Sequence, residues 1–150
     1  MYFVTKITQI VNDTTRLLLF EHAVLRIRLP LILKLKDEEK LNEFEKLHDF
    51  VVNSHAKVED IVVFPLVEKK IVDPYSHDHL LIKKYGDGIL KDRRMDWIER
   101  YIKTVLDHNK GEEEKVFPTL KQEISLEPSI RIIKEFGNEK YYYITGLEVP

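Results

Sequence analysis

The sequence predicts an all-α fold, an up-down four-helix bundle followed by a short C-terminal extension that we expect to be a β-hairpin. Three observations favour this fold class. Four stretches of the chain carry apolar residues every three or four positions, the spacing of one face of an α-helix. The connections between them are short, which suits antiparallel neighbours. Each stretch also places one histidine on its apolar face.

The length and composition are those of one globular unit. The chain has 150 residues, of which 43% are hydrophobic and 33% are charged, a balance typical of a folded domain with a well-charged surface. We expect an N-terminal arm over residues 1–13, the helix bundle over residues 14–123 and the extension over residues 124–150.

Charge and cysteine content exclude several classes of partner and site. The net charge is −2 with both signs interspersed, so we expect no nucleic acid and no membrane as partner. No apolar run reaches the roughly 20 residues of a membrane span, and the N-terminus lacks the pattern of a signal peptide, which predicts a cytoplasmic protein. Because the chain has no cysteine, any metal site must use His, Asp, Glu or Tyr.

The first predicted helix runs from Thr14 to about Lys36, with Asp13 or Thr14 as its N-cap. Pro30 lies inside this pattern. An interior proline removes a backbone hydrogen bond and costs about 3 kcal/mol, so we expect a kink or break near Arg26.

The second predicted helix runs from about Asp37 to Phe64, where the following Pro65 ends it. The dipeptide Asp73-Pro74 predicts the start of a third helix, with Asp as the N-cap and Pro in the first turn. The turn-like residues 85–88, Tyr-Gly-Asp-Gly, predict that this helix is short.

The fourth predicted helix carries Ile98, Tyr101, Val105 and His108 on one face, and Phe117-Pro118 ends it. The extension differs in composition. Residues 130–136 and 140–147 are rich in β-branched and aromatic residues around Gly137-Asn138, which favours a hairpin. A short terminal helix is the alternative, and residues 1–11 could supply a strand that pairs with the extension.

A motif is written twice in the chain. Residues 55–65 read HAKVEDIVVFP and residues 108–118 read HNKGEEEKVFP. Each copy has His, Glu four positions later, a further acid, and then Phe-Pro. On a helix, positions i and i+4 share a face with Cβ atoms about 6 Å apart. Each His-Glu pair could therefore offer a nitrogen and a carboxylate to one metal ion.

The polar pairs fall on faces that are otherwise apolar, where unpaired charges are costly unless they bind a metal. His22 and His79 lie on the corresponding faces of the first and third helices, so every helix directs one histidine inward. Four imidazoles and two shared carboxylates suffice for two metal ions. Nitrogen and carboxylate ligands suit iron, manganese or zinc, and the two bridging carboxylates favour iron. The candidate ligands are His22, His55, Glu59, His79, His108 and Glu112.

This pattern resembles the hemerythrin-like (HHE cation-binding) domains, over about residues 14–122. The resemblance implies that His22 and His55 hold one iron ion and that His79 and His108 hold the other. It also implies that Glu59 and Glu112 bridge two Fe2+/Fe3+ ions together with a solvent-derived oxygen.

Two positions depart from the pattern of the oxygen carriers. These carriers have a fifth histidine one turn before the third-helix ligand and a final His-x-x-x-x-Asp. Here Tyr75 occupies the first position, and Glu112 lies at +4 rather than +5. Both departures make the chain more similar to the sensing and iron-repair branches. Tyr75 could ligate, donate a hydrogen bond to a bound ligand, or pack as a core aromatic, and we favour packing.

We interpret the other polar residues near the motifs, and Gly111, as residues that do not bind the metal. Asp60 and Glu113 sit one position after the preferred carboxylates and are rotated away from the histidine, so we do not assign them as ligands. His48 is too far along its helix to share a metal with His55, and we expect a hydrogen-bonded or surface role. His77 points away from His79 and should be solvated. Gly111 suggests close approach of another helix.

Three functions are compatible with these residues. The first is a non-haem di-iron protein that binds O2 or NO for sensing, storage or stress protection. The second is an enzyme that repairs iron-sulfur clusters or reduces NO, with a redox partner protein. The third is an iron-storing or metal-free interaction module, in which the extension forms a homodimer contact.

Overall fold

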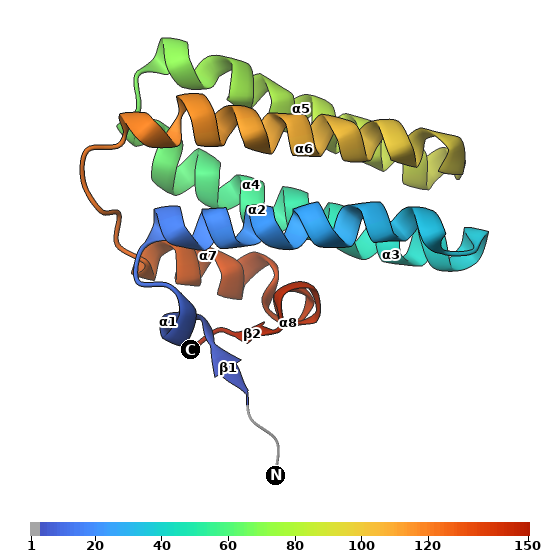
Figure 1. Ribbon diagram of the computed structural model, residues 1–150, viewed down its shortest axis with the longest axis horizontal. Helices are drawn as coiled ribbons and strands as arrows, with labels where there is room; N and C mark the ends of the chain where they lie inside the picture. Colours follow the sequence, from blue (N-terminus) through green and yellow to red (C-terminus); the bar gives the residue numbers. More distant parts are fainter. Residues whose placement is uncertain (1–3) are drawn as a thin grey trace.

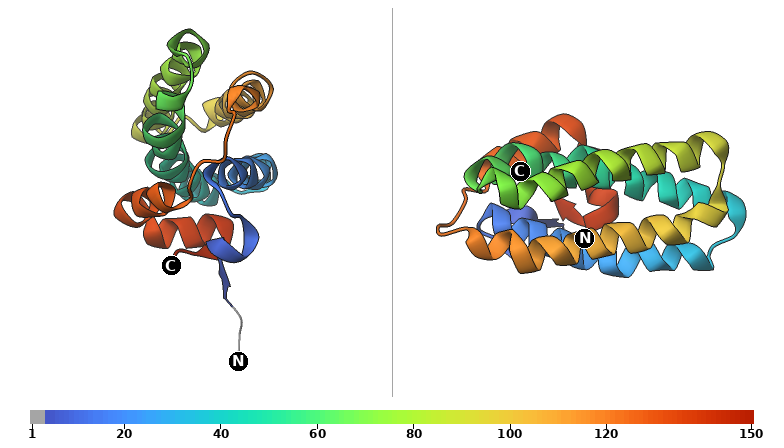
Figure 2. Two further views of the ribbon diagram at one scale, coloured as in Figure 1. Left: turned by 90° about the vertical axis from the view of Figure 1, so that its left-hand side faces the viewer. Right: turned by 90° about the horizontal axis from the view of Figure 1, so that it is seen from above.

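The computed structural model describes residues 4–150, and these residues are mainly helical, as the sequence predicts. The order of the elements gives four long helical segments between residues 14 and 115. These segments lie side by side (Figure 1). Viewed nearly end-on, they surround a common interior, and the C-terminal helices lie outside it against the first and second segments (Figure 2). The buried apolar core runs along this interior. Among residues 4–150, no helix combines the length and apolar composition that crossing a membrane requires.

The first segment is α2 (Thr14–Leu31), which starts as predicted, because the Asp13 side chain accepts a hydrogen bond from the Arg16 backbone N–H at 2.9 Å. The predicted interruption near Arg26 is wrong. The helix continues through Pro30, which lies in its last turn, and a 3₁₀ turn (Ile32–Lys34) follows. Near a helix end, a proline removes only one of the last backbone bonds, so the segment ends rather than kinks.

The second segment begins at Asp37, as predicted, but is not a uniform α-helix. It comprises α3 (Asp37–Phe50), a π-helical stretch (Val51–His55), α4 (Ala56–Val58), a second π-helical stretch (Glu59–Val63) and a 3₁₀ turn (Phe64–Leu66). The π-helical stretches place His55 and Glu59 at their boundaries with α4. Such stretches inside helices often occur at functional sites.

The third segment corrects the prediction of a short helix starting at Asp73. Helix α5 (Lys69–Asp92) begins before Pro74 and includes residues 85–88, which are helical rather than a turn. The reason is tertiary, since a Cβ atom at Gly86 would collide with the imidazole ring of His48. The glycine therefore permits close packing of two helices rather than a turn. The helix ends at Arg93, which adopts the left-handed conformation.

The fourth segment agrees with the prediction. A 3₁₀ turn (Met95–Trp97) leads into α6 (Ile98–Lys115), and a further 3₁₀ turn (Phe117–Thr119) ends it at the predicted Phe-Pro.

The prediction of a C-terminal hairpin is wrong. The extension forms α7 (Glu127–Phe136) and α8 (Asn138–Thr145), so the helical alternative is closer to the structure. Pro128 in the first turn favours the start of α7. The β-branched and aromatic residues that suggested strands lie on these helices instead, and three of them are buried: Ile133, Tyr141 and Ile144.

The predicted pairing of the two termini occurs on a small scale. Strand β1 (Thr5–Lys6), followed by α1 (Ile7–Ile10), pairs in parallel with β2 (Leu147–Glu148). Residues 1–3 of the predicted arm lie outside the described residues.

Candidate metal centre

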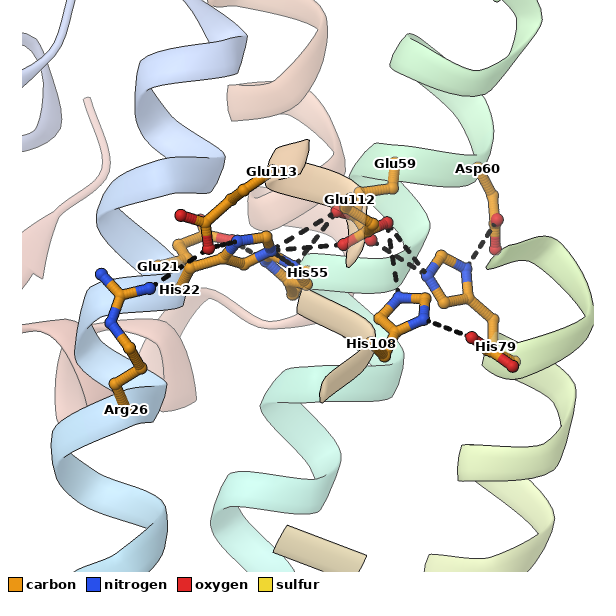
Figure 3. Close-up of polar contacts among 11 residues, drawn as sticks. Glu21, His22, Arg26, His55, Glu59, Asp60, His79, His108, Glu112 and Glu113 are labelled. Atoms are coloured by element: carbon orange, nitrogen blue, oxygen red, sulfur yellow. Dashed lines mark hydrogen bonds and ion pairs between the residues drawn. The ribbon is translucent and has the colours of Figure 1, made fainter. Parts of the chain in front are cut away.

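The four segments bring the six sequence-predicted site residues together in the buried interior. His22 comes from α2, His79 from α5 and His108 from α6, while His55 and Glu59 flank α4. All four histidines and both glutamates are buried. In Figure 3, His22 and His55 lie on one side of Glu59 and Glu112, and His79 and His108 lie on the other.

These side chains form two groups that could each hold a metal ion, with potential ligand atoms within 4.8 Å of one another. Glu59 and Glu112 belong to both groups. One group adds His22 and His55, and the other adds His79 and His108. The two glutamates thus lie between the two pairs of histidines, as the repeated motif predicts.

Each histidine is oriented by a carboxylate on its Nδ1 atom, which leaves Nε2 for the interior (Figure 3). The Nε2 atoms of His22 and His55 lie 3.0 Å apart, and His79 Nε2 lies 3.0 Å from Glu59 Oε1. Carboxylates that fix the ring in this way are a common support for metal-binding histidines. The four pairs are His22 with Glu113 at 3.0 Å, His55 with Glu21 at 2.7 Å, His79 with Asp60 at 2.8 Å and His108 with Asp78 at 2.9 Å.

These four supporting acids follow the repeat of the sequence. Glu21 and Asp78 each precede the first histidine of a helix pair and bond to the second histidine of that pair. Asp60 and Glu113 each follow a candidate ligand and bond to a histidine of the other pair. Sequence reasoning excluded Asp60 and Glu113 as ligands but did not find this role. The sequence did contain a signal for it, since an acid directly follows the candidate glutamate in both copies of the motif.

The Phe-Pro ends of the motifs also contribute to the site. The Phe64 ring stacks on His79 with ring centroids 5.3 Å apart, and the Phe117 ring stacks on His22 at 5.7 Å. The Phe of each motif copy thus covers a histidine of the other helix pair and shields it from water.

The buried polar atoms at the centre fit a bound cation. Four of them have no hydrogen-bond partner among the described residues: Glu59 Oε2, both carboxylate oxygens of Glu112 and His108 Nε2. Leaving a buried polar group without a partner costs free energy, and more so for a charged group. A metal ion between these atoms would satisfy all of them, and imidazole and carboxylate are ligands that divalent metals accept.

Electrostatics in the protein alone favour the protonated forms of His79 and His108. Burial by itself would lower the pKa of His79, but its bonds to Asp60 and Glu59 raise that pKa to about 10. For His108, burial is likewise outweighed, by Asp78 and Glu112, and the pKa rises to about 9. Burial would raise the pKa of Glu59, but the surrounding histidines, His55 foremost, hold it well below the usual value. The centre is therefore a set of carboxylates balanced by cations.

The C-terminal extension completes this arrangement. The Tyr141 hydroxyl on α8 donates a hydrogen bond to Glu21 Oε2 at 2.7 Å, and the other oxygen of Glu21 accepts from His55. Glu21 is 1% exposed, whereas Asp60, Asp78 and Glu113 are 30–45% exposed and can reach water. Burial, followed by the charge of Glu21, raises the pKa of Tyr141 well above its usual value, so its hydroxyl remains a donor.

Tyr75 packs against the His108 ring with centroids 5.6 Å apart, the role that the sequence favoured. Gly111 permits this approach, since a Cβ atom there would lie 2.9 Å from Tyr75 Cε1.

The two histidines outside the centre behave differently from each other. His48 is buried and hydrogen-bonded, with Tyr101 Oη at 2.7 Å and Asp87 Oδ1 at 3.0 Å. His77 is exposed.

Comparison with known proteins agrees with this geometry. The family model for the hemerythrin HHE cation binding domain matches residues 13–120, which include all six candidate ligands. The comparisons with curated proteins and with solved structures gave no match. Because the family match spans most of the chain, this protein belongs to the hemerythrin HHE cation-binding domain family.

Proposed function

We propose that this protein is a non-haem di-iron protein that binds O2 or NO for sensing, storage or stress protection. In this proposal, His22 and His55 hold one ion and His79 and His108 hold the second. Glu59 and Glu112, which belong to both groups, would supply carboxylate ligands to both ions. The observation that carries the proposal is that the two candidate metal groups share these two glutamates.

The architecture assigned to this function is an up-down four-helix bundle made of α2, the segment containing α3 and α4, α5, and α6. Each of the four segments supplies ligands to the centre, so the two ions would tie the segments together. Two observations support this view. The chain belongs to a cation-binding family, and buried atoms of Glu59, Glu112 and His108 have no hydrogen-bond partner in the part of the chain that the structure describes.

The protein's own residues would orient the ligands and exclude water. Asp60, Asp78, Glu21 and Glu113 hold the four imidazole rings through Nδ1, so that their Nε2 atoms remain directed at the centre. Iron bound there would supply electrons and the coordination positions that O2 or NO needs. Tyr75 beside His108 is not a fifth histidine, which leaves the ligand set on that side less complete than in the oxygen carriers.

Metal analysis and spectroscopy test this function. The full-length protein, purified without a metal-chelating tag, is expected to contain about two iron ions per chain. An ultraviolet-visible absorption band should bleach on anaerobic reduction and return in air. Absence of metal after reconstitution with ferrous iron would overturn the proposal, and stable binding of manganese or zinc alone would overturn the choice of iron.

Variants assign the ligands. His55→Ala and Glu59→Ala are expected to lower the metal content toward one ion per chain or none, because each removes a buried ligand. His77→Ala should leave it unchanged, since His77 is exposed on the same helix as His79. Equal metal content in all three variants contradicts the assignment.

A measurement of NO turnover separates a binding protein from an enzyme. Catalytic consumption of NO in the presence of a reductant and a redox partner protein would favour an enzyme over a binding protein.

A further inference from the structure

A cavity of about 220 Å³ adjoins the candidate metal centre. It lies between the π-helical stretch Val51–His55 with α4 on one side and α5 on the other, and α6 contributes Val105, His108 and Asn109 to its lining. His55 and His79 also line it. A molecule in this cavity would therefore contact imidazoles from both candidate metal groups.

The cavity connects the centre with the surface. Its inner residues, such as Ile82 and Val105, are buried, whereas Leu80 at its outer side is 68% exposed and Lys83 is also exposed. A small molecule from solution could enter beside the exposed Leu80 and Lys83 and reach His79 and His108.

The volume exceeds what a diatomic gas requires. A water molecule occupies about 30 Å³ in the liquid, and an apolar cavity of about 150 Å³ in another protein binds benzene. The 220 Å³ available here thus accommodates an organic molecule of about that size. The walls formed by Val51, Ala56, Ile82 and Val105 are apolar and suit a hydrocarbon body.

Apart from His108, whose Nε2 belongs to the candidate metal centre, one polar side chain in the lining has an unused hydrogen-bonding group. Asn109 is 2% exposed, and its amide nitrogen has no hydrogen-bond partner among the described residues. A buried amide without a partner is costly, and a ligand oxygen would satisfy it. The other asparagine of the lining, Asn53, is already engaged, since its amide donates to Asp49 Oδ1 at 2.8 Å.

The charged residues at the mouth are also engaged, which argues against an ionic ligand. Lys83 donates to Asp87 at 2.7 Å, and the Lys57 ammonium lies 4.6 Å from the Phe136 ring centroid. Asp60 bonds to His79. Outside the candidate metal centre, the polar requirement of the cavity is therefore one neutral hydrogen bond at Asn109.

We propose that this cavity binds a small uncharged organic molecule, with a hydrocarbon body of about the size of benzene and one hydroxyl or carbonyl oxygen that accepts a hydrogen bond from Asn109. The inference adds an organic ligand to the O2 or NO of the proposed function, and it rests on that function only in placing the organic ligand beside the metal ions. Ligand binding itself depends on the cavity and Asn109.

Calorimetric titration of the full-length protein, as purified, tests this proposal with cyclohexanone as the probe. Saturable binding is expected, and Asn109→Leu should weaken it about tenfold, the effect of one lost hydrogen bond. The matched control Asn53→Leu alters the same cavity without removing an unpaired amide and should change the affinity much less. Benzene, which has no oxygen, should bind the wild-type protein and Asn109→Leu with similar affinity.

A second variant guards against misfolding of Asn109→Leu. Ala56→Leu adds volume from α4 and should abolish binding of both probes while helical content by circular dichroism stays unchanged. Absence of saturable cyclohexanone binding to the wild-type protein, or equal affinity in wild type and a folded Asn109→Leu, overturns the proposal. Metal content measured on the same samples separates the two ideas, since probe binding without metal contradicts only the proposed function, and metal without probe binding contradicts only this inference.

Discussion

At the scale of single residues, the centre depends on acids that are not candidate ligands. Asp60 and Glu113 each lie directly after a shared glutamate in the sequence, but they bond to the outer nitrogen of His79 and His22. A helix turns about 100° per residue, so neighbouring carboxylates face different directions. One acid of each pair faces the interior and the next orients a ring from outside.

This arrangement predicts that the supporting acids affect metal affinity. Asp60→Asn and Glu113→Gln keep the shape of each side chain but remove its charge, so the imidazole loses the partner that raises its basicity. We expect metal affinity to fall roughly 10- to 100-fold in each variant. Competition with a chromophoric chelator measures this change.

Glu114→Gln is the matched control for these variants. Glu114 is exposed and pairs with Lys110 at 4.0 Å, away from the centre. The same affinity in Asp60→Asn, Glu113→Gln and Glu114→Gln would show that hydrogen bonds to Nδ1 do not support the site.

At the scale of elements, α8 extends the hydrogen-bond network of the centre beyond the part of the chain that matches the family. Tyr141 satisfies the buried oxygen of Glu21 that faces away from His55. Without the extension, a fully buried carboxylate oxygen would lose its donor. The helices after residue 120 therefore contribute to the site through Glu21 rather than through a ligand of their own.

Tyr141→Phe tests this contribution of α8. The variant keeps the buried ring but leaves Glu21 Oε2 without a donor, which costs about 1–3 kcal/mol of folding free energy. We also expect faster loss of metal to a chelator, because His55 is held less firmly. Chemical unfolding and metal-release kinetics measure the two effects. Tyr142→Phe is the control, since Tyr142 is 49% exposed, and an identical response in both variants would contradict the role of Tyr141.

Helix α5 contains a second internal control, its pair of glycines. Gly86 faces the His48 ring, which lies buried between Tyr101 and Asp87, whereas nothing lies within 4 Å of a Cβ atom at Gly88. Gly86→Ala should destabilise the protein by about 1–3 kcal/mol through overpacking. Gly88→Ala should stabilise it by about 0.5–1 kcal/mol through helix propensity. Thermal unfolding measures both, and a gain in stability for Gly86→Ala would contradict the packing described for His48.

At the scale of the whole molecule, the repeated motif predicts which side chains come together better than local composition predicts the elements. His55, Glu59, His108 and Glu112 could be identified because helical spacing alone places each pair on one face. The extent of α5 could not be predicted, because Gly86 is explained by its packing against the His48 ring, which comes from another helix. A helical extension was only the alternative prediction for a similar reason, since Tyr141 is buried by tertiary contacts that override its β propensity.

The balance of charge across the centre makes the pH dependence of stability differ between metal-free and metal-loaded protein. In the metal-free chain, the pKa of His79 is about 10 and that of His108 is about 9, against about 6.5 for an unfolded histidine. Protonation of these residues thus stabilises the fold fully below about pH 6.5, and this contribution is lost as the pH rises through the folded values. Each such proton changes the unfolding free energy by about 1.4 kcal/mol per pH unit in that window.

Metal binding should remove this dependence, because an imidazole that ligates a metal through Nε2 is neutral. We therefore expect the midpoint of thermal unfolding of the metal-free protein to fall between pH 7 and pH 10 and that of the metal-loaded protein to fall much less. Metal uptake at pH 7 should also release protons, which calorimetry in buffers of different ionisation enthalpy detects. His77→Gln, which alters an exposed histidine, should leave both slopes unchanged. A metal-free protein that gains stability from pH 7 to pH 9 would contradict the charge balance described here, since its buried histidines would then be neutral before any metal arrives.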